Sequence, residues 1–312
     1  MKAIQSFRSN SMRPALESFG GPSLVKIQLQ MMALSAVTIA KYYPNFEFIT
    51  DDAGKEMAER CKLPYSKITS IGENFDSDEV FSIHSKFVAY SSSEPFLHFD
   101  RDVLLWKPLP ARCEQAGILA VHPETSLWPF YEDRLDSLGV NCSWVPKLDY
   151  KYFANKSAIN MAVFGGNNIA VINKYAEYVL NFVKSVNGFR DLPPTDRSLV
   201  RGTISPIIEN LWASYLIQSE YGHKVEYIMR EREAFTNDGA VAQLTHLHGL
   251  KLADKETDLK KKYEIFSQIF NGLRRENSVV YDAVEAYTTV PESTPEPTPE
   301  TTTQLIEETQ NA

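Results

Sequence analysis

Residues 95–105 read PFLHFDRDVLL, and this stretch decides the fold. Residues 95–99 form a short apolar run of the kind that predicts a buried strand. The triplet Asp100-Arg101-Asp102 follows directly, and residues 103–105 are apolar again. Since α/β sheets bind ligands beyond the carboxyl ends of their strands, an acidic triplet at this position predicts a site on such a sheet.

The rest of the chain alternates short apolar runs with helical patterns. Runs that predict strands or extended segments span residues 2–7, 46–50, 68–71, 118–121, 162–164 and 224–228. Patterns that predict helices span residues 23–43, 53–62, 79–92, 174–185, 206–221 and 258–275, and we expect the last of these to be the final helix. The alternation predicts an α/β fold with a mostly parallel central sheet flanked by helices.

The C-terminal part has a different composition. From residue 291 the chain reads PESTPEPTPETTTQLIEETQNA, in which proline, threonine and glutamate dominate. So few apolar residues predict a disordered extension. We therefore expect a single domain over residues 1–275, a connecting segment over 276–290 and a disordered acidic tail over 291–312.

The net charge of −8 is unevenly distributed over the 312 residues. No Lys or Arg follows Arg275, whereas eight of the 40 acidic residues do, so residues 1–275 hold as many acids as their 32 bases. A broad basic surface for nucleic acid is therefore not expected.

Hydropathy and cysteine usage indicate a cytoplasmic protein. No apolar run reaches the roughly 18 residues of a membrane helix, and residues 1–8 lack a secretory pattern. Cys61, Cys113 and Cys142 are widely spaced, as reduced thiols are. Three lysines at 260–262 predict either a peripheral contact with anionic lipid or a solvated helix face.

Asp100 and Asp102 are the strongest candidate metal ligands. In an Asp-x-Asp at a strand end, both carboxylates can lie on one side of the chain. Mg²⁺ and Mn²⁺ prefer such oxygen ligands, often completed by phosphates of the substrate. The alternative is a structural turn. A second triplet, Asp76 and Asp78, lies in a polar stretch before a predicted helix, where an N-terminal cap is the simpler interpretation.

Residues 246–251, HLHGLK, are a second candidate segment. His246 and His248 lie on the same side of an extended chain, and neutral imidazole can ligate Mn²⁺. Lys251 can bind a phosphate as a point charge. The alternative is a pair of buried, hydrogen-bonded histidines.

Two further segments are candidates on weaker patterns. Residues 160–168, NMAVFGGNN, contain Gly165 and Gly166, where either a ligand or another backbone can approach closely. Glu209 lies in a predicted helix with the sequence ENLW and is either a nucleophile or base near a sugar, or a solvated helix residue.

Together these segments resemble nucleotide-sugar-dependent glycosyltransferases of the GT-A fold. FLHFDRDVLLWKPLP resembles their strand–Asp-x-Asp–strand element, and HLHGLK is similar to the late His-x-x-Gly-x-x-Lys element of the glycogenin and lipopolysaccharide galactosyltransferase group. NMAVFGGNN and ENLW resemble the Phe-Gly-Gly strand and the Asp-Glu-Ser helix of the blood-group and α1,3-galactosyl transferases. The order of these elements matches over residues 2–275.

The resemblance implies a role for each candidate. Asp100 and Asp102 would hold Mn²⁺ or Mg²⁺ against the diphosphate, with His248 as the completing ligand and His246 as the second choice. Glu209 would take the place of the catalytic carboxylate, without the Asp and Ser that flank it in the family. The donor would contact Phe7, Arg8, Asp51, Lys86, Asp100, Gly165, Gly166 and Lys251.

The implied enzyme is a metal-dependent hexosyltransferase. It would move a sugar from a nucleotide-sugar donor, most simply a UDP-sugar, to a hydroxyl of a glycan, polysaccharide or lipid-linked acceptor, with retention of configuration. The aromatic-rich residues 123–157 would form either an acceptor lid or a loop packed on its own side chains. Two alternatives stay open: a nucleotidyltransferase that makes the activated sugar, and a non-catalytic module that binds it.

Overall fold

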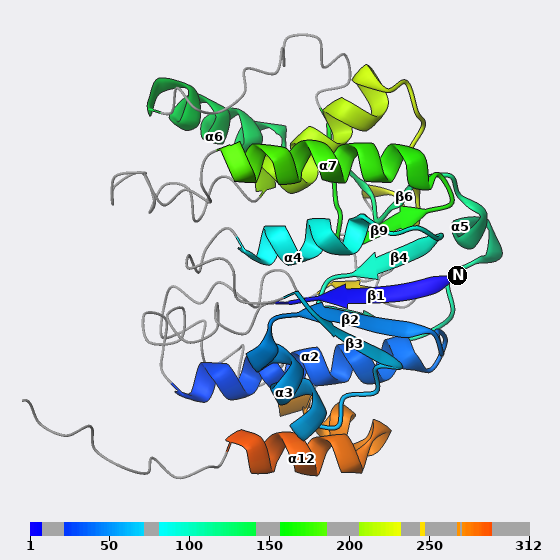
Figure 1. The fold of residues 1–312 in the computed structure, drawn as a ribbon, viewed down its shortest axis with the longest axis vertical. Helices are drawn as coiled ribbons and strands as arrows, with labels where there is room; N and C mark the ends of the chain where they lie inside the picture. Colours follow the sequence, from blue (N-terminus) through cyan, green and yellow to red (C-terminus); the bar gives the residue numbers. More distant parts are fainter. Residues whose placement is uncertain are drawn as a thin grey trace, which may run out of the picture.

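A seven-stranded sheet forms the centre of a computed structural model of the chain (Figure 1). The structure describes residues 1–7, 22–71, 81–141, 157–185, 206–231, 244–246, 267–268 and 270–288. The strands lie side by side in the order β10 (Glu226–Tyr227), β6 (Leu119–Ala120), β9 (Val163–Gly166), β4 (Phe96–Phe99), β1 (Lys2–Ser6), β2 (Phe46–Thr50) and β3 (Lys67–Ser70). All neighbours are parallel except β9, which runs antiparallel to β4 and β6. The predicted α/β class with a mostly parallel central sheet is confirmed.

Helices cover both faces of the sheet (Figure 1). One face is covered by α4 (Phe81–Tyr90) and α7 (Ile169–Ser185), and the other by α2 (Pro22–Ala40), α3 (Asp52–Arg60) and α12 (Ser278–Thr288). Successive side chains of a strand point to opposite faces, so Phe96 packs into the core beneath α4 and α7, whereas Leu97 and Phe99 pack beneath α2. Both faces of β4 are buried, which is why its sequence is a continuous apolar run with a single histidine.

Shorter elements extend the edge at which β4 and β6 end. Two small antiparallel ladders pair β5 (Val103–Leu105) with β11 (Leu244–His246) and β7 (Pro123–Glu124) with β8 (Ala158–Ile159). The remaining helices are α5 (Ala111–Gln115), α6 (Trp128–Asn141) and two π-helical segments, η4 (Ile207–Trp212) and η5 (Tyr215–Glu220). β5 and β7 follow β4 and β6 directly, so the residues between each pair of strands lie at the carboxyl edge of the sheet.

The structure differs from the sequence-based expectation at the C-terminal side. We expected residues 258–275 to form the final helix and residues 276–290 to be a connecting segment. Residues 267, 268 and 270–276 are helical, which agrees with the C-terminal half of the predicted helix. A further helix, α12, lies within the latter segment and packs against α2 and α3. Val280 and Val284, one helical turn apart, are buried in the same apolar cluster as Leu34 and Met57. Residues 258–266 and 291–312 lie outside the described residues.

Among the residues that the structure describes, no helix has both the length and the hydropathy to cross a lipid bilayer.

Candidate functional site

Three charged side chains from distant parts of the sequence meet at the carboxyl end of β4. Lys86 of α4 lies with its Nζ 2.8 Å from Asp100 Oδ1 and 2.6 Å from Glu209 Oε2. Asp100 directly follows β4, and Glu209 lies in η4. We call Lys86, Asp100 and Glu209 the lysine cluster. The structure thus brings together three residues that the sequence singled out separately.

The lysine cluster is largely withdrawn from solvent. The side chains of Lys86, Asp100 and Glu209 are 6%, 24% and 15% exposed. Burial by itself would lower the pKa of an ammonium group, but the carboxylates of Asp100 and Glu209 outweigh it and raise the pKa of Lys86 well above its ordinary value. Lys86 is therefore positively charged at neutral pH.

The local sequence explains how each member is placed. Lys86 lies on the buried face of α4, beside Ile83, Phe87 and Tyr90 in the helix. Glu209 is carried by a π-helical turn, a rare geometry that is frequent at functional sites. The Tyr175 hydroxyl of α7 donates to the carbonyls of Ile208 and Glu209 at 2.6 and 3.2 Å, which secures this turn against α7.

His98 lies directly beneath the lysine cluster. Its Nε2 is hydrogen-bonded to Ser6 Oγ at 2.8 Å, and its Nδ1 is 3.9 Å from Asp100 Oδ1. Burial, with help from the charge of Lys86, lowers the pKa of His98 to about 3. Ser6, His98 and Asp100 follow one another as the members of a hydrolase triad do. The 3.9 Å between His98 Nδ1 and Asp100 Oδ1 is, however, too long for the hydrogen bond that orients a base. An imidazole with so low a pKa is also a poor general base. His98 is therefore a neutral, buried support for the cluster.

Asp102 and Phe7 are more deeply buried than Asp100. Asp102 is 0% exposed and Phe7 is 3% exposed. The guanidinium of Arg101 lies 4.4 Å from the centroid of the Phe7 ring, and burial lowers its pKa although Asp102 and Asp100 oppose the shift. Because the Phe7 ring packs into the core with Arg101 across it, the structure gives Phe7 no open face on which a donor base would stack.

The pairing of β5 with β11 bears on the proposed metal ligands. His246 lies opposite Val103 in this antiparallel ladder, so β11 ends one residue from the position opposite Asp102. The two segments that suggested a metal site, 143 residues apart, therefore meet at one edge. In the described part of the chain, no three His, Cys, Asp or Glu side chains form a group that could hold a metal ion. Arg8, His248 and Lys251, like the side chain of His246, lie outside the described residues.

Asp51 has a structural contact that its sequence position did not reveal. Its Oδ1 accepts a hydrogen bond from the backbone N–H of Gly54 at 2.7 Å, which makes it the N-cap of α3. The side chain is 1% exposed. Asp51 thus lies at the predicted strand end, but the bond the structure shows is to the helix it begins.

Gly165 and Gly166 lie at the opposite end of β4 from Asp100. They pair with Leu97 and Phe96, because β9 runs antiparallel to β4. We expected them to flank the donor sugar, and this reversal of direction removes them from the edge that carries Asp100. A Cβ at Gly165 would lie 2.1 Å from the Phe96 carbonyl oxygen, so the glycine is required for strand packing.

A second carboxylate, which the sequence analysis did not single out, is buried near Glu209. Glu124 is 4% exposed, and it accepts hydrogen bonds from Tyr131 Oη, from Asn160 Nδ2 at 2.8 Å and from Asn210 Nδ2 at 3.3 Å. We call Glu124, Tyr131, Asn160 and Asn210 the amide cluster. The available signal was the strand predicted at 118–121, after which Glu124 is the first carboxylate.

Part of the aromatic-rich segment is buried in the core. Trp128 and Tyr131 of α6 are 8% and 1% exposed and belong to the main apolar core. Their faces are therefore not available for stacking on a sugar. Trp144, Tyr150 and Tyr152 lie outside the described residues.

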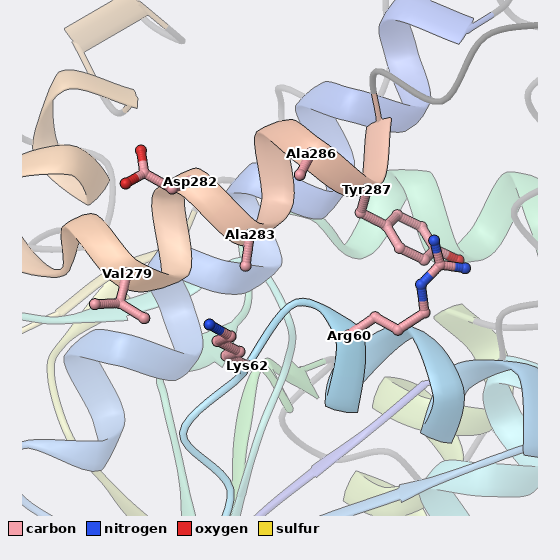
Figure 2. A pocket seen from close by; sticks show the side chains of 7 residues that line it. All are labelled: Arg60, Lys62, Val279, Asp282, Ala283, Ala286 and Tyr287. Carbon is pink, nitrogen blue, oxygen red and sulfur yellow. The ribbon is translucent and has the colours of Figure 1, made fainter.

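A pocket lies away from the carboxyl edge, between α3 and α12 (Figure 2). It is lined by Arg60, Lys62, Val279, Asp282, Ala283, Ala286 and Tyr287. Arg60 ends α3, whereas Asp51 begins it, so this pocket lies at the other end of that helix from the strand end. Arg60 itself is stacked on Tyr287, with its guanidinium 4.7 Å from the ring centroid.

Fold and site together define an α/β protein with a buried, charge-coupled cluster at the carboxyl edge of its sheet. The chain belongs to the family of unknown function DUF6734, whose sequence profile matches residues 1–287. The matched region includes α12. No curated protein matches the sequence.

Solved structures give only a distant similarity. The galactosyltransferase LgtC, in complex with donor and acceptor sugar analogues, is similar at 12% identity with a TM-score of 0.35. The similarity covers 59% of this chain and 64% of that one. An active-site mutant of LgtC gives 11% identity and the same TM-score of 0.35 over the same shares. At this TM-score the likeness carries no argument about function, which must be built from the site.

Proposed function

We propose that this chain is a glycosyltransferase of the GT-A class that moves a sugar from a nucleoside-diphosphate-sugar donor to a hydroxyl acceptor. The observation that supports it best is the lysine cluster, which gathers two carboxylates and an ammonium group where ligands bind on such sheets. Sugar transfer needs these charges: a cation near the leaving diphosphate and a carboxylate near the anomeric carbon.

The proposal includes a divalent cation at this edge. Asp100 and Asp102 offer the oxygen ligands that Mn²⁺ and Mg²⁺ prefer. His246 lies opposite Val103 in the β5–β11 ladder, and His248 follows two residues later in the sequence. In the proposal His248 completes the site and His246 is the second choice. When bound, the metal would stabilise charge on the leaving nucleoside diphosphate.

The chain's own side chains would divide the remaining work. Lys86 would direct its charge to the donor, and Glu209, released from Lys86, would face the anomeric carbon as nucleophile or base. Lys251 is proposed to contact a donor phosphate, and Arg8 the nucleoside part of the donor. A UDP-sugar is the proposed donor, and a glycan, polysaccharide or lipid-linked hydroxyl the proposed acceptor, with retention of configuration.

The first experiment is a thermal-shift screen of nucleotide sugars with and without Mn²⁺. A ligand that binds only the folded state stabilises it by about 2.7 kcal/mol at a hundredfold excess over Kd. We expect a UDP-sugar to raise the melting temperature only when Mn²⁺ is present. A matched pair of variants tests the site: Asp100→Asn/Asp102→Asn should abolish this shift, whereas Asp76→Asn/Asp78→Asn should keep it. Equal shifts in both variants would contradict the metal site.

A turnover assay separates the proposal from its alternatives. We expect release of nucleoside diphosphate and sugar transfer in the wild type, and loss of both in Glu209→Gln with donor binding retained. Formation of a nucleotide sugar from a nucleoside triphosphate and a sugar phosphate would identify a nucleotidyltransferase instead. Binding without any turnover would identify a non-catalytic module.

A further inference from the structure

Glu124 is a buried carboxylate that the proposed function does not use. A buried charge is costly unless every lone pair is satisfied. Three neutral donors meet it, each from a different part of the chain: Tyr131 from α6, Asn160 from between β8 and β9, and Asn210 from η4. Asn210 Nδ2 also donates to Tyr131 Oη at 3.0 Å, which links two of the donors to each other.

The network requires an acceptor without hydrogens at its centre. An ionised carboxylate is acceptor-only, whereas the glutamine side chain has one acceptor oxygen and an NH₂ group. In Glu124→Gln that NH₂ group would be directed at one of the amide or hydroxyl donors. A substitution of almost no volume would therefore break the pattern.

The amide cluster reaches the lysine cluster through one peptide unit. Asn210 directly follows Glu209 in the π-helical turn. Tyr175 secures the carbonyls of this turn from the side of α7, and Glu124 secures the Asn210 side chain from the side of β7. The backbone that carries Glu209 is thereby fixed from two directions, and Glu209 Oε2 lies 2.6 Å from Lys86 Nζ.

We propose that Glu124 is a positioning residue for Glu209. By accepting from Asn210 it sets the orientation of the π-helical turn and hence the distance of Glu209 from Lys86 and from a bound sugar. The inference rests on the proposed function for its catalytic meaning, but the placement of Glu209 against Lys86 can be tested without any turnover. Misplacing a reacting group by about 1 Å can lower a rate about a hundredfold.

The test uses reversal of hydrogen-bond polarity. Glu124→Gln sets an amide against an amide, and Asn210→Asp sets a carboxylate against a carboxylate. The double variant Glu124→Gln/Asn210→Asp restores a donor–acceptor pair in the opposite sense. We expect each single variant to lower kcat about 10- to 100-fold with KM for the donor within about twofold, and the double variant to recover at least about tenfold of the loss. Ser214→Ala is the matched control, because it removes another bond of this helical region, from Ser214 Oγ to the Ser157 carbonyl at 2.7 Å.

Chemical labelling of Lys86 provides the readout that does not depend on activity. Acetic anhydride followed by mass spectrometry should modify Lys86 slowly in the wild type and in Ser214→Ala, and several times faster in Glu124→Gln. A wild-type kcat in Glu124→Gln, or a double variant no better than the singles, would overturn the proposal. If the wild type transfers no sugar, the proposed function fails, and the labelling alone decides: unchanged Lys86 reactivity in Glu124→Gln refutes the positioning role and increased reactivity supports it.

Discussion

The lysine cluster and the amide cluster are neighbours that bury carboxylates in opposite ways. Asp100 and Glu209 are balanced by an ammonium group at 2.8 and 2.6 Å. Glu124 is balanced by a hydroxyl and two amides, with no cation among the contacts described for it. An ion pair is strong but non-directional, so it can be exchanged for another charged group, whereas several neutral hydrogen bonds fix direction. The difference suggests that the first cluster meets a charged ligand and the second holds its shape.

The largest expected effect comes from removing the shared cation. Lys86→Met leaves two buried carboxylates without their partner, and breaking a buried pair in this way costs about 3–5 kcal/mol. Denaturant unfolding at pH 7 measures this loss of unfolding free energy in Lys86→Met. Lys67→Met is the control, because Lys67 is 63% exposed and 3.6 Å from Glu47, and such a surface pair contributes at most about 1 kcal/mol. A loss no greater than the control's would contradict the ionic description of the cluster.

The amide cluster should lose less when one donor is removed. Tyr131→Phe deletes the hydrogen bond to Glu124 and the one that Tyr131 Oη accepts from Asn210 Nδ2, and we expect a destabilisation of about 1.5–3 kcal/mol. Tyr42→Phe removes an exposed hydrogen bond to the Trp106 carbonyl and should cost less than about 1 kcal/mol. If Tyr131→Phe proved as costly as Lys86→Met, the distinction between exchangeable and directional pairing would not hold.

His98 makes the lysine cluster sensitive to acid. Its pKa is lowered to about 3 in the folded protein from an ordinary value of 6.5, so between these values the unfolded chain binds the extra proton. The contribution of His98 to the free energy of unfolding is therefore fully present above about pH 6.5. It decreases as the pH falls, by roughly 2 kcal/mol between pH 7 and pH 5. In His98→Gln, unfolding free energies measured across this range should be flatter by that amount. Parallel pH curves for the variant and the wild type would show that His98 does not titrate in this way.

Asp51 should give the smallest effect, since it belongs to neither cluster. Asp51→Ala removes the cap of α3 and should cost about 1 kcal/mol, whereas Asp51→Asn keeps an acceptor for the Gly54 N–H and should be nearly neutral. Thermal unfolding of both variants checks this. Loss of Mn²⁺-dependent nucleotide binding in a folded Asp51→Asn would instead add Asp51 to the lysine cluster's ligand site.

Much of the fold followed from the sequence because its elements are locally consistent. The run at 95–99 contains β4, which is buried on both faces and can be recognised from continuous hydrophobicity. In the run at 46–50 buried residues alternate with half-buried ones, which is the period-2 signal of a strand. The direction of β9 could not be recognised in this way, because an apolar strand reads the same whether it pairs parallel or antiparallel. Because β9 runs antiparallel to β4, Gly165 and Gly166 lie at the opposite end of β4 from Asp100, which the sequence did not predict.

The site was anticipated in its residue types but not in its contacts. Lys86 and Glu209 were separate candidates, 123 residues apart in the sequence. Nothing in the sequence near either residue predicts that the Lys86 ammonium group lies between the carboxylates of Asp100 and Glu209. Glu124 was missed, because a single carboxylate three residues after the strand predicted at 118–121 has no signature of its own. Only its three donors, from residues 131, 160 and 210, distinguish it from a solvated glutamate.

By itself the sequence determined the class of fold, the acidic triplet after a buried strand and the balance of charge over residues 1–275. These features depend on residues that are close together in the sequence, so the periodicity and composition of short segments are enough to predict them. The tertiary structure alone decided which carboxylates share a cation, which one accepts from a hydroxyl and two amides, and which one caps a helix. Those outcomes depend on groups tens to more than a hundred residues apart, and their energies come from burial and pairing, which exist only once the sheet and its helices have packed.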